Sequence, residues 1–339
     1  YKIMNPYATN VPLKFVNFNI SNTQGGLNSN IVWNIAYDRQ TNKLWLGTPK
    51  GLSMLDTYYG KDIVSLLPSD KEPEQDFFGL GASSFFYSNN GRLWISGTHR
   101  GLASVYKTSN SFVNWTLPSG VLYKDYISSL YYSSQSSIFV ALRNNGFLTF
   151  NPTNTLDSRY YPISTSVNGF ASIGNGEVAV CTEREGLMIY KDGEIIGAIN
   201  TTNAPWLTDM CVYTMLVDDD NNWLVGSYKG LSIRYVNGKG VHLDGDKFGV
   251  LPTSQIYTIV KSGNSVWLGT RNNGILHLQG DIHNLKLLKV KQYDVLHDTK
   301  LKINTVKKII TDLNGTVWAC SSEAGLLMYD KKTDGFVNA

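Results

Sequence analysis

Four arginines could carry the chemistry of a binding site, because they stand at nearly the same position of a recurring sequence pattern. They are Arg100, Arg143, Arg184 and Arg271. A guanidinium group presents a fork of N–H donors that matches a carboxylate or a sulfate. Tyr126 and Trp206, from neighbouring segments, would offer flat surfaces to a sugar ring. Together these residues predict ligand binding that is sensitive to salt and that favours acidic over neutral oligosaccharides.

The same residues also have a plainer interpretation. Loops are polar in most proteins, and aromatic side chains often pack between structural elements. Glu183 and Glu185 would in addition neutralise Arg184 locally. The sequence leaves both interpretations open, and we favour a binding face for the group as a whole.

Other chemistries find little support in the sequence. Its histidines and cysteines show no metal-binding spacing, and no HExxH, CxxC, GxSxG, Walker or GxGxxG motif occurs. The segments Asp218-Asp219-Asp220 and Asp244-Gly245-Asp246 carry ligands that calcium accepts, but they fall where hairpin turns are expected. We therefore predict no catalytic residue, no metal and no cofactor in this chain.

The net charge of the chain limits which classes of partner it can have. A net charge of +3 is too small to indicate a nucleic-acid partner. Seven lysines between Lys286 and Lys308 form the only basic concentration. We interpret it as a solvated strand edge protected against strand addition, in preference to a binding patch. No apolar run approaches the roughly 18 residues that a membrane helix needs.

A repeat of 40 to 51 residues determines which elements position these side chains. Its key position is a glycine before a strand, where a positive φ or a close backbone approach is expected. The seven repeat glycines are Gly51, Gly101, Gly146, Gly186, Gly230, Gly274 and Gly325. Such a period predicts an all-β, seven-bladed β-propeller with four-stranded antiparallel blades, in which residues 1–339 form one domain.

An aromatic residue precedes most of the repeat glycines by six or seven positions. These residues are Trp45, Trp94, Phe139, Trp223, Trp267 and Trp318, with Ala179 in the fourth copy. A binding residue has no reason to recur in phase with every strand. We therefore predict that these side chains pack between adjacent blades.

The order of strands within each repeat predicts where the loops gather. The innermost strands are expected at Ile31–Tyr37, Ser83–Tyr87, Ile127–Tyr132, Phe170–Ile173, Cys211–Val217, Ile256–Val260 and Thr305–Ile310. The loop before such a strand and the loop between the second and third strands lie on the same face of the ring. That geometry would place the four arginines around one funnel. Phe15–Phe18 alternates like a strand and is expected to close the ring as the outer strand of blade seven.

The repeat resembles a known family. The pattern Val-x-x-Ile-x-x-Asp, then Leu-Trp-Leu-Gly-Thr-x-x-Gly-Leu and Asp, is carried by Val32, Ile35, Asp38, Leu44-Trp45-Leu46-Gly47-Thr48, Gly51-Leu52 and Asp56. Val306, Ile309, Asp312, Trp318 and Gly325-Leu326 repeat it near the end of the chain. It is similar to the two-component regulator propeller repeat, and the similarity covers nearly the whole chain.

The resemblance implies a function. Such propellers form the periplasmic sensor region of membrane-anchored hybrid histidine kinases, usually as two rings followed by a β-sandwich, a membrane helix and the kinase. It therefore implies that this chain is a non-enzymatic sensor segment that detects an oligosaccharide or another small ligand. Further sensor and kinase domains of the same protein would be its partners, and a homodimer is left open.

Two other functions stay open at this point. A propeller enzyme such as a polysaccharide lyase or glycosidase would need a carboxylate pair, or a Tyr or His with Arg, at the funnel. The candidate acids there are Glu183, Glu185 and Glu323. A pure protein-interaction scaffold would need no small ligand at all.

Overall fold

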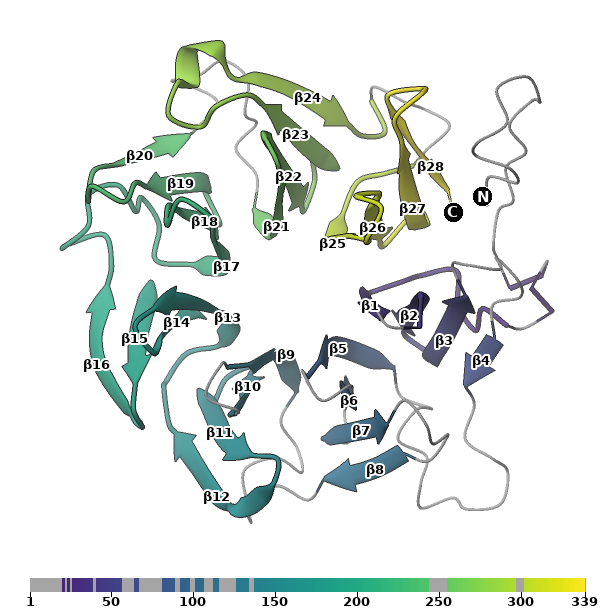
Figure 1. Ribbon diagram of the computed structural model, residues 1–339, viewed down its shortest axis with the longest axis horizontal. Coiled ribbons are helices and arrows are strands. Elements are labelled where there is room, and N and C mark those ends of the chain that lie inside the picture. The colour runs from purple at the N-terminus through teal and green to yellow at the C-terminus, as the bar shows by residue number, and fades with distance from the viewer. Residues whose placement is uncertain are drawn as a thin grey trace.

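The described part of the chain forms a ring of seven sheets (Figure 1). The computed structural model describes residues 20–21, 23–24, 26–38, 41–56, 64–66, 81–88, 92–97, 101–106, 112–115, 126–133, 137–243, 255–296 and 302–338. Each sheet has four antiparallel strands in sequence order. The predicted all-β, seven-bladed propeller is thereby confirmed.

Every blade runs from the centre of the ring to its circumference. The innermost strands are β1 (Asn34–Asp38), β5 (Ala82–Tyr87), β9 (Ile127–Tyr132), β13 (Val167–Gly174), β17 (Val212–Val217), β21 (Ile256–Ser262) and β25 (Val306–Thr311). The second strands are β2 (Lys43–Thr48), β6 (Arg92–Gly97), β10 (Ile138–Leu142), β14 (Glu177–Thr182), β18 (Trp223–Ser227), β22 (Ser265–Thr270) and β26 (Val317–Ser321). The innermost strands lie close to their predicted positions.

The third and fourth strands complete the blades. The third strands are β3 (Gly51–Asp56), β7 (Leu102–Tyr106), β11 (Phe147–Asn151), β15 (Leu187–Lys191), β19 (Gly230–Arg234), β23 (Ile275–Gln279) and β27 (Gly325–Asp330). The outermost strands are β4 (Val64–Leu66), β8 (Phe112–Trp115), β12 (Asn154–Tyr161), β16 (Glu194–Ile199), β20 (Gly240–Leu243), β24 (Lys289–Tyr293) and β28 (Gly335–Asn338). A 3-10 helix, η2 (Leu285–Leu287), precedes β24.

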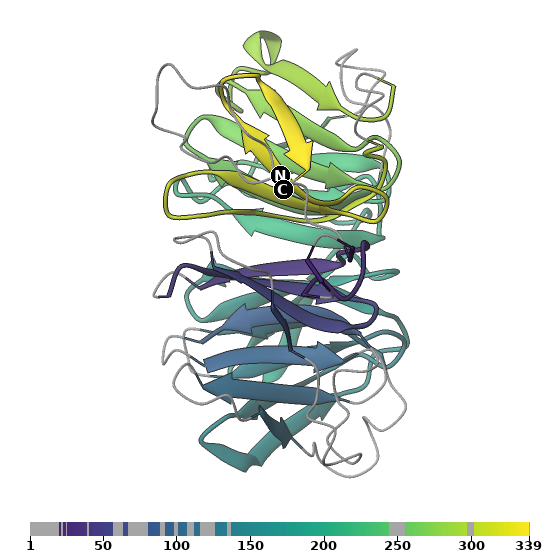
Figure 2. The ribbon, with the colours of Figure 1, turned by 90° about the vertical axis from the view of Figure 1, so that its right-hand side faces the viewer.

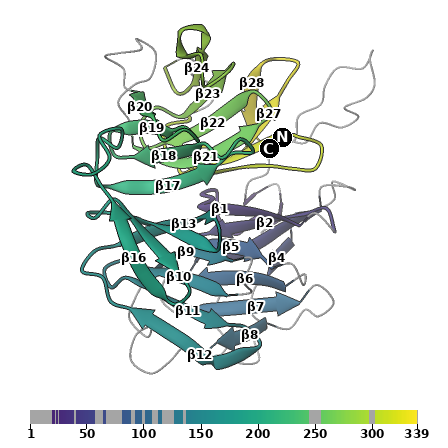
Figure 3. The same ribbon diagram turned by 60° about the vertical axis from the view of Figure 1, so that its left-hand side comes forward.

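Seen from the side, the strands run roughly along the axis of the ring (Figure 2). The outermost strands β12 and β16 lie at its circumference (Figure 3). No helix in the described residues is both long enough and apolar enough to cross a membrane.

The repeat glycines adopt the backbone conformation that their positions required. All seven have a positive φ, from 64° at Gly274 to 125° at Gly230. At Gly274 a Cβ would also lie 2.1 Å from the carbonyl oxygen of Tyr293. Both the conformation and the close approach exclude other residues there.

The repeated aromatic residues lie between blades, as predicted. Trp94 is fully buried and meets the ring of Phe150 from the next blade edge-on, at a centroid distance of 5.7 Å. Trp267 contacts Tyr329 and Phe336 of blade seven in the same way, at 4.7 and 5.7 Å. The core of the protein is therefore a series of clusters, one at each junction between blades.

Trp223 is out of phase with the others. It lies three residues before Gly226, whereas Trp267 lies two residues before the equivalent Gly269. Side chains alternate along a strand, so Trp223 packs against blade four rather than blade six. The loop after β18 is one residue shorter than the loop after β22. Trp223 and Trp267 therefore both lie seven residues before their repeat glycines, although they occupy different positions in their strands.

The strand that completes blade seven corrects one prediction. The outer position that we assigned to Phe15–Phe18 is occupied by β28, which forms a hairpin with β27. Phe336 of β28 is buried against Trp267, and the hairpin closes a much shorter loop than a strand from the N-terminus would. Residues 15–18 themselves lie outside the described residues.

Candidate functional site

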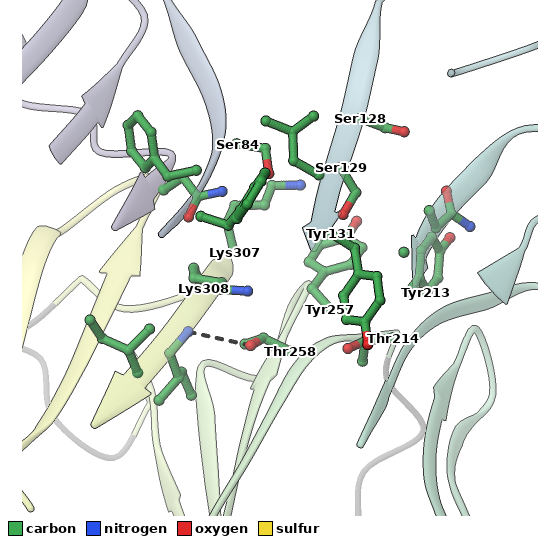
Figure 4. Close-up of a pocket in the computed structure, with 18 of the residues that line it drawn as sticks. Ser84, Ser128, Ser129, Tyr131, Tyr213, Thr214, Tyr257, Thr258, Lys307 and Lys308 are labelled. Atoms are coloured by element: carbon green, nitrogen blue, oxygen red, sulfur yellow. Dashed lines mark hydrogen bonds between the residues drawn. The ribbon is translucent and has the colours of Figure 1, made fainter. Parts of the chain in front are cut away.

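The seven innermost strands enclose a central cavity of about 790 Å³. Every blade contributes lining residues, and most of them are polar or aromatic. A cavity of this size lies within the range of small-ligand sites. Figure 4 shows its interior, with side chains from β5, β9, β17, β21 and β25 directed into one space.

A β-bulge in the innermost strands supplies the residues at the mouth of the cavity. In six blades the pairing with the second strand skips one residue near the start of the strand. In blade one, Trp33 lies at the equivalent place, just before Asn34, which pairs with Gly47. We call these seven residues the bulge ring: Trp33, Ser83, Ser128, Asn168, Tyr213, Tyr257 and Lys307. Bulges redirect side chains and often occur beside functional sites.

One half of the cavity wall is held together by its own polar side chains. Ser83 donates a hydrogen bond to the carbonyl of Ile127 in the next blade, at 3.0 Å. Ser128 donates in the same way to Val167, and Asn168 donates to Val212 at 2.8 Å. Asn34 of blade one likewise donates to the carbonyl of Ser83. These side chains join blades one to five. We call this the committed half of the wall, because its side chains donate hydrogen bonds between blades.

The other half carries Tyr213, Tyr257 and Lys307. The rings of the two tyrosines meet edge-on at a centroid distance of 5.1 Å. Both hydroxyls donate to Oε1 of Gln255, at 3.4 and 3.1 Å. The Lys307 ammonium lies 4.0 Å from the centre of the Tyr257 ring, a cation–π contact. This half presents aromatic faces and a cation to the cavity.

Lys307 and Lys308 bring positive charge into the cavity. Both extend from β25 into the cavity, and both side chains are exposed (Figure 4). No aspartate or glutamate occurs among the described residues that line the cavity. Burial lowers the pKa of both ammonium groups, and the charge of Arg271 lowers that of Lys307 further.

The loops gather on one face of the ring, as predicted. In five blades the first residue after the second strand donates a backbone hydrogen bond to the residue just before the innermost strand. Arg143 to Tyr126 and Arg271 to Gln255 are two of these bonds, both 3.0 Å long. The Arg271 side chain also donates to Gln255, at 3.2 Å. The arginine loops therefore surround the mouth of the cavity.

Three of the six predicted site residues come together at this mouth. Tyr126 lines the cavity, and the Arg143 guanidinium lies 5.6 Å from the centre of its ring. Arg271 and Arg143 are both close enough to Lys307 for their charges to lower its pKa. Arg143 and Arg271 are exposed, so they are accessible to a ligand.

The remaining predicted residues lie elsewhere or make no described contact. Trp206 is half-buried and packs against Gly240 of the outermost strand β20, away from the cavity lining. A Cβ on Gly240 would lie 2.5 Å from the Trp206 side chain, so this contact is structural. Arg184 is exposed in its loop. Arg100 lies outside the described residues.

Two carboxylates at the mouth accept hydrogen bonds from neighbouring loops. Glu183 accepts a hydrogen bond from the Ser166 hydroxyl at 2.8 Å. Glu323 accepts from the Thr305 amide at 2.9 Å and from Ser321 at 3.1 Å. Both carboxylates hold loops of their own or the preceding blade in place.

The turn interpretation of Asp218 agrees with its contacts. Its carboxylate accepts hydrogen bonds from the backbone amides of Asp220 and Asn222 and an ion pair from Lys261 at 2.8 Å. Burial raises the pKa of Asp218, but the hydrogen bonds from the Lys261 ammonium and from the amide and side chain of Asn222 outweigh it and lower the pKa. No group of three or more potential metal ligands occurs in the described residues. The segment Asp244–Asp246 lies outside them.

Sequence reasoning missed the two cavity lysines. They belong to the basic concentration that we interpreted as a solvated edge, and Lys289 and Lys291 do lie on the outermost strand β24. Lys307 and Lys308, however, lie on the innermost strand. Their alignment with Tyr257 and Thr258 of blade six was the signal that could have revealed them.

Comparisons with known proteins support the fold. No family model matches the sequence, and no curated protein matches it. Among solved structures, the chain is similar to the extracellular domain of the hybrid two-component system BT3049 from B. thetaiotaomicron, with a TM-score of 0.70 and 17% identity. The match covers 91% of this chain and 40% of that one.

Two further structures show how widely the architecture occurs. The WD40 propeller domain of Doa1 matches 90% of this chain and 95% of its own, with a TM-score of 0.66 and 12% identity. PorZ, a surface component of the type-IX secretion system of Porphyromonas gingivalis, matches 88% of this chain and 46% of its own, with a TM-score of 0.65 and 13% identity. At these identities the similarities concern the fold.

Proposed function

We propose that this chain is the extracellular, periplasmic ligand-sensing propeller of a hybrid two-component histidine kinase. The observation that carries the proposal is the divided wall of the central cavity. Side chains of blades two to four are committed to bonds between blades, whereas Tyr213, Tyr257 and Lys307 face an open cavity of about 790 Å³. The fold shared with the extracellular domain of BT3049 supports the same role.

The ligand in this proposal is an oligosaccharide bound at the mouth of the cavity. Tyr126, Tyr213 and Tyr257 supply flat rings on which a sugar packs, and Arg143 and Arg271 supply donors at the edge. Loops and bulges determine specificity, because packing between blades constrains the strands.

The signal leaves the propeller through other parts of the protein. The chain spans about 40% of the length of the BT3049 chain that it matches. A membrane anchor, a kinase and further sensor domains belong to the proposal, as does a homodimer through which binding is transmitted.

The proposed segment is not an enzyme. A glycosidase needs two carboxyl groups that flank the scissile bond. The described lining of the cavity offers none, and Glu183 and Glu323 at the mouth hold loops.

The test is a binding screen on the purified propeller. Neutral and acidic oligosaccharides are screened by the shift in melting temperature, and the positives are titrated by calorimetry. We expect one class to bind, and Tyr257→Ala to weaken it about tenfold or more. Ile196→Ala, which truncates an exposed side chain on the outermost strand β16, is the control and should bind normally.

Two results would contradict the proposal. Release of shorter sugars from the oligosaccharides, detected by chromatography, would indicate an enzyme. Failure of every oligosaccharide to raise the melting temperature would favour an interaction scaffold.

A further inference from the structure

The two lysines of β25 reach the cavity because of the bulge in that strand. Val306 pairs with Ser321 and Lys308 with Cys320, so Lys307 is the additional residue. In a regular strand adjacent side chains point to opposite faces. Here both ammonium groups enter the same cavity, Lys307 from the bulge ring and Lys308 from the next position of the strand (Figure 4).

Neither lysine forms an ion pair among the described residues. Each ion pair found there involves another lysine: Lys191, Lys261 or Lys291. The Lys307 ammonium lies over the face of the Tyr257 ring. Burial and the charge of Arg271 lower the pKa of Lys307, and Glu323 at the mouth opposes them only through its charge. Two like charges on adjacent residues of a partly desolvated cavity are unfavourable without an anion.

The equivalent residues of other blades show that packing does not require lysine. The position of Lys308 is filled by Thr258 in blade six, Thr214 in blade five and Gly169 in blade four. Small neutral side chains therefore suffice for the architecture. Packing therefore does not explain why lysines occur here, and a functional role does.

We infer that the central cavity is selective for an acidic sugar, whose carboxylate or sulfate group is bound between Lys307 and Lys308. This inference rests on the proposed function and names its ligand class. It moves the anion site from the exposed arginines of the mouth into the cavity. There a charged hydrogen bond is stronger than in bulk water.

The surroundings of the lysines favour a sugar over a free inorganic ion. The cavity of about 790 Å³ is far larger than one oxyanion needs. The Tyr213 and Tyr257 rings lie beside the lysines and match the apolar face of a pyranose. The hydroxyl groups of Ser84, Ser129 and Thr214 line the same space and can bond to sugar hydroxyls (Figure 4).

The first test compares two probes that differ only in charge. Trigalacturonic acid and its fully methyl-esterified form have the same rings and linkages, but the ester has no carboxylate. Calorimetry at constant ionic strength should show the acid binding at least about tenfold more tightly than the ester. In the double variant Lys307→Met/Lys308→Met that preference should disappear.

A matched control and a stability measurement accompany the titration. Lys331→Met removes one exposed positive charge from a turn of the same blade and should leave the preference intact. Without ligand, the double variant should melt at a higher temperature than the wild type, because two uncompensated charges have been removed. A purely structural role of the lysines predicts a lower melting temperature.

The outcomes separate the two proposals. If the ester binds as tightly as the acid, this inference is wrong and the sensor function stands. If neither probe binds but the screen finds a neutral oligosaccharide that does, this inference is wrong and the sensor function stands; if no oligosaccharide binds, both are wrong. If sulfate or phosphate raises the melting temperature as much as the acid at equal concentration, the cavity takes a free oxyanion, and the assignment to a sugar is overturned. A double variant that retains the preference overturns the site.

Discussion

The two halves of the cavity wall are built from the same bulge but use it differently. In blades two to four the bulge residue is Ser83, Ser128 or Asn168, and its side chain bonds to a backbone carbonyl of the next blade. In blades five to seven it is a large aromatic or cationic residue. Among the described residues, none of those three side chains bonds to a backbone carbonyl of the next blade.

The difference shows how a repeated fold makes room for a site. A bulge interrupts the backbone ladder and frees one side chain in each blade. Where that side chain is small and polar, it stabilises the ring. Where it is large, the junction between blades depends on packing further out, and the freed side chain can contact a ligand. At the junction of blades six and seven, the inner contacts are the cation–π contact of Lys307 with Tyr257 and a long hydrogen bond from the Ile309 amide to Thr258, at 3.4 Å.

The largest expected effect tests the packing of that junction. Trp267 contacts His277, Tyr329 and Phe336, and it is buried. Trp267→Ala should lower the free energy of unfolding by roughly 3–5 kcal/mol, measured by urea denaturation. Trp206→Ala, at a half-buried site, should cost less than about 2 kcal/mol. A loss below about 1 kcal/mol for Trp267→Ala would mean that packing does not hold this junction.

The same junction should respond to pH through His277. Burial and, less strongly, the charge of Lys291 lower its pKa from 6.5 to about 4, and Asp334 opposes them. The folded state then keeps His277 neutral, while the unfolded state binds a proton below about pH 6.5. Stability contributed by this residue is therefore lost as the pH falls from about 6.5 toward 4.

We expect this loss to be roughly 1–2 kcal/mol between pH 7 and pH 5. It is measured as the difference between the wild type and His277→Gln, because other groups titrate in both proteins. Identical pH dependence of the two unfolding free energies would show that His277 does not weaken this junction in acid.

A smaller effect tests the committed half of the wall. Asn168→Ala removes the hydrogen bond to the Val212 carbonyl and should cost about 1 kcal/mol. Tyr213→Phe removes a hydroxyl whose bond to Gln255 is longer, at 3.4 Å, and should cost less than about 0.5 kcal/mol. Ligand affinity should show the reverse order. Equal effects on stability and on binding would remove the distinction between the halves.

The smallest effect concerns the mouth. Arg143→Ala should change stability by less than about 0.5 kcal/mol, because the side chain is exposed. It should weaken acidic ligands only about two- to threefold at low salt, and not at all at high salt. A larger loss that persists in high salt would place the anion site at the mouth instead of among the cavity lysines.

Much of the fold was accessible from local sequence. The repeat glycines need a positive φ, so a single residue type signals each one, and the strand on either side alternates visibly. The common face of the loops followed from the strand order alone. The structure places Tyr126, Arg143 and Arg271 at the mouth, and their role in binding stays a prediction. Trp206 lies away from the cavity lining, because its contact with Gly240 joins segments that the repeat does not relate.

The sequence by itself determined the number of blades, the inner strands of each blade and the residues that pack between adjacent blades. Each of these depends on spacing within one repeat. The tertiary structure decided which face each side chain takes, because one residue more in a bulge or one less in a loop reverses the alternation. It turned Trp223 toward blade four and placed Lys307 and Lys308 in the cavity. Packing of adjacent blades and closure of the ring bring those lysines beside residues that lie 40 or more positions away in the chain.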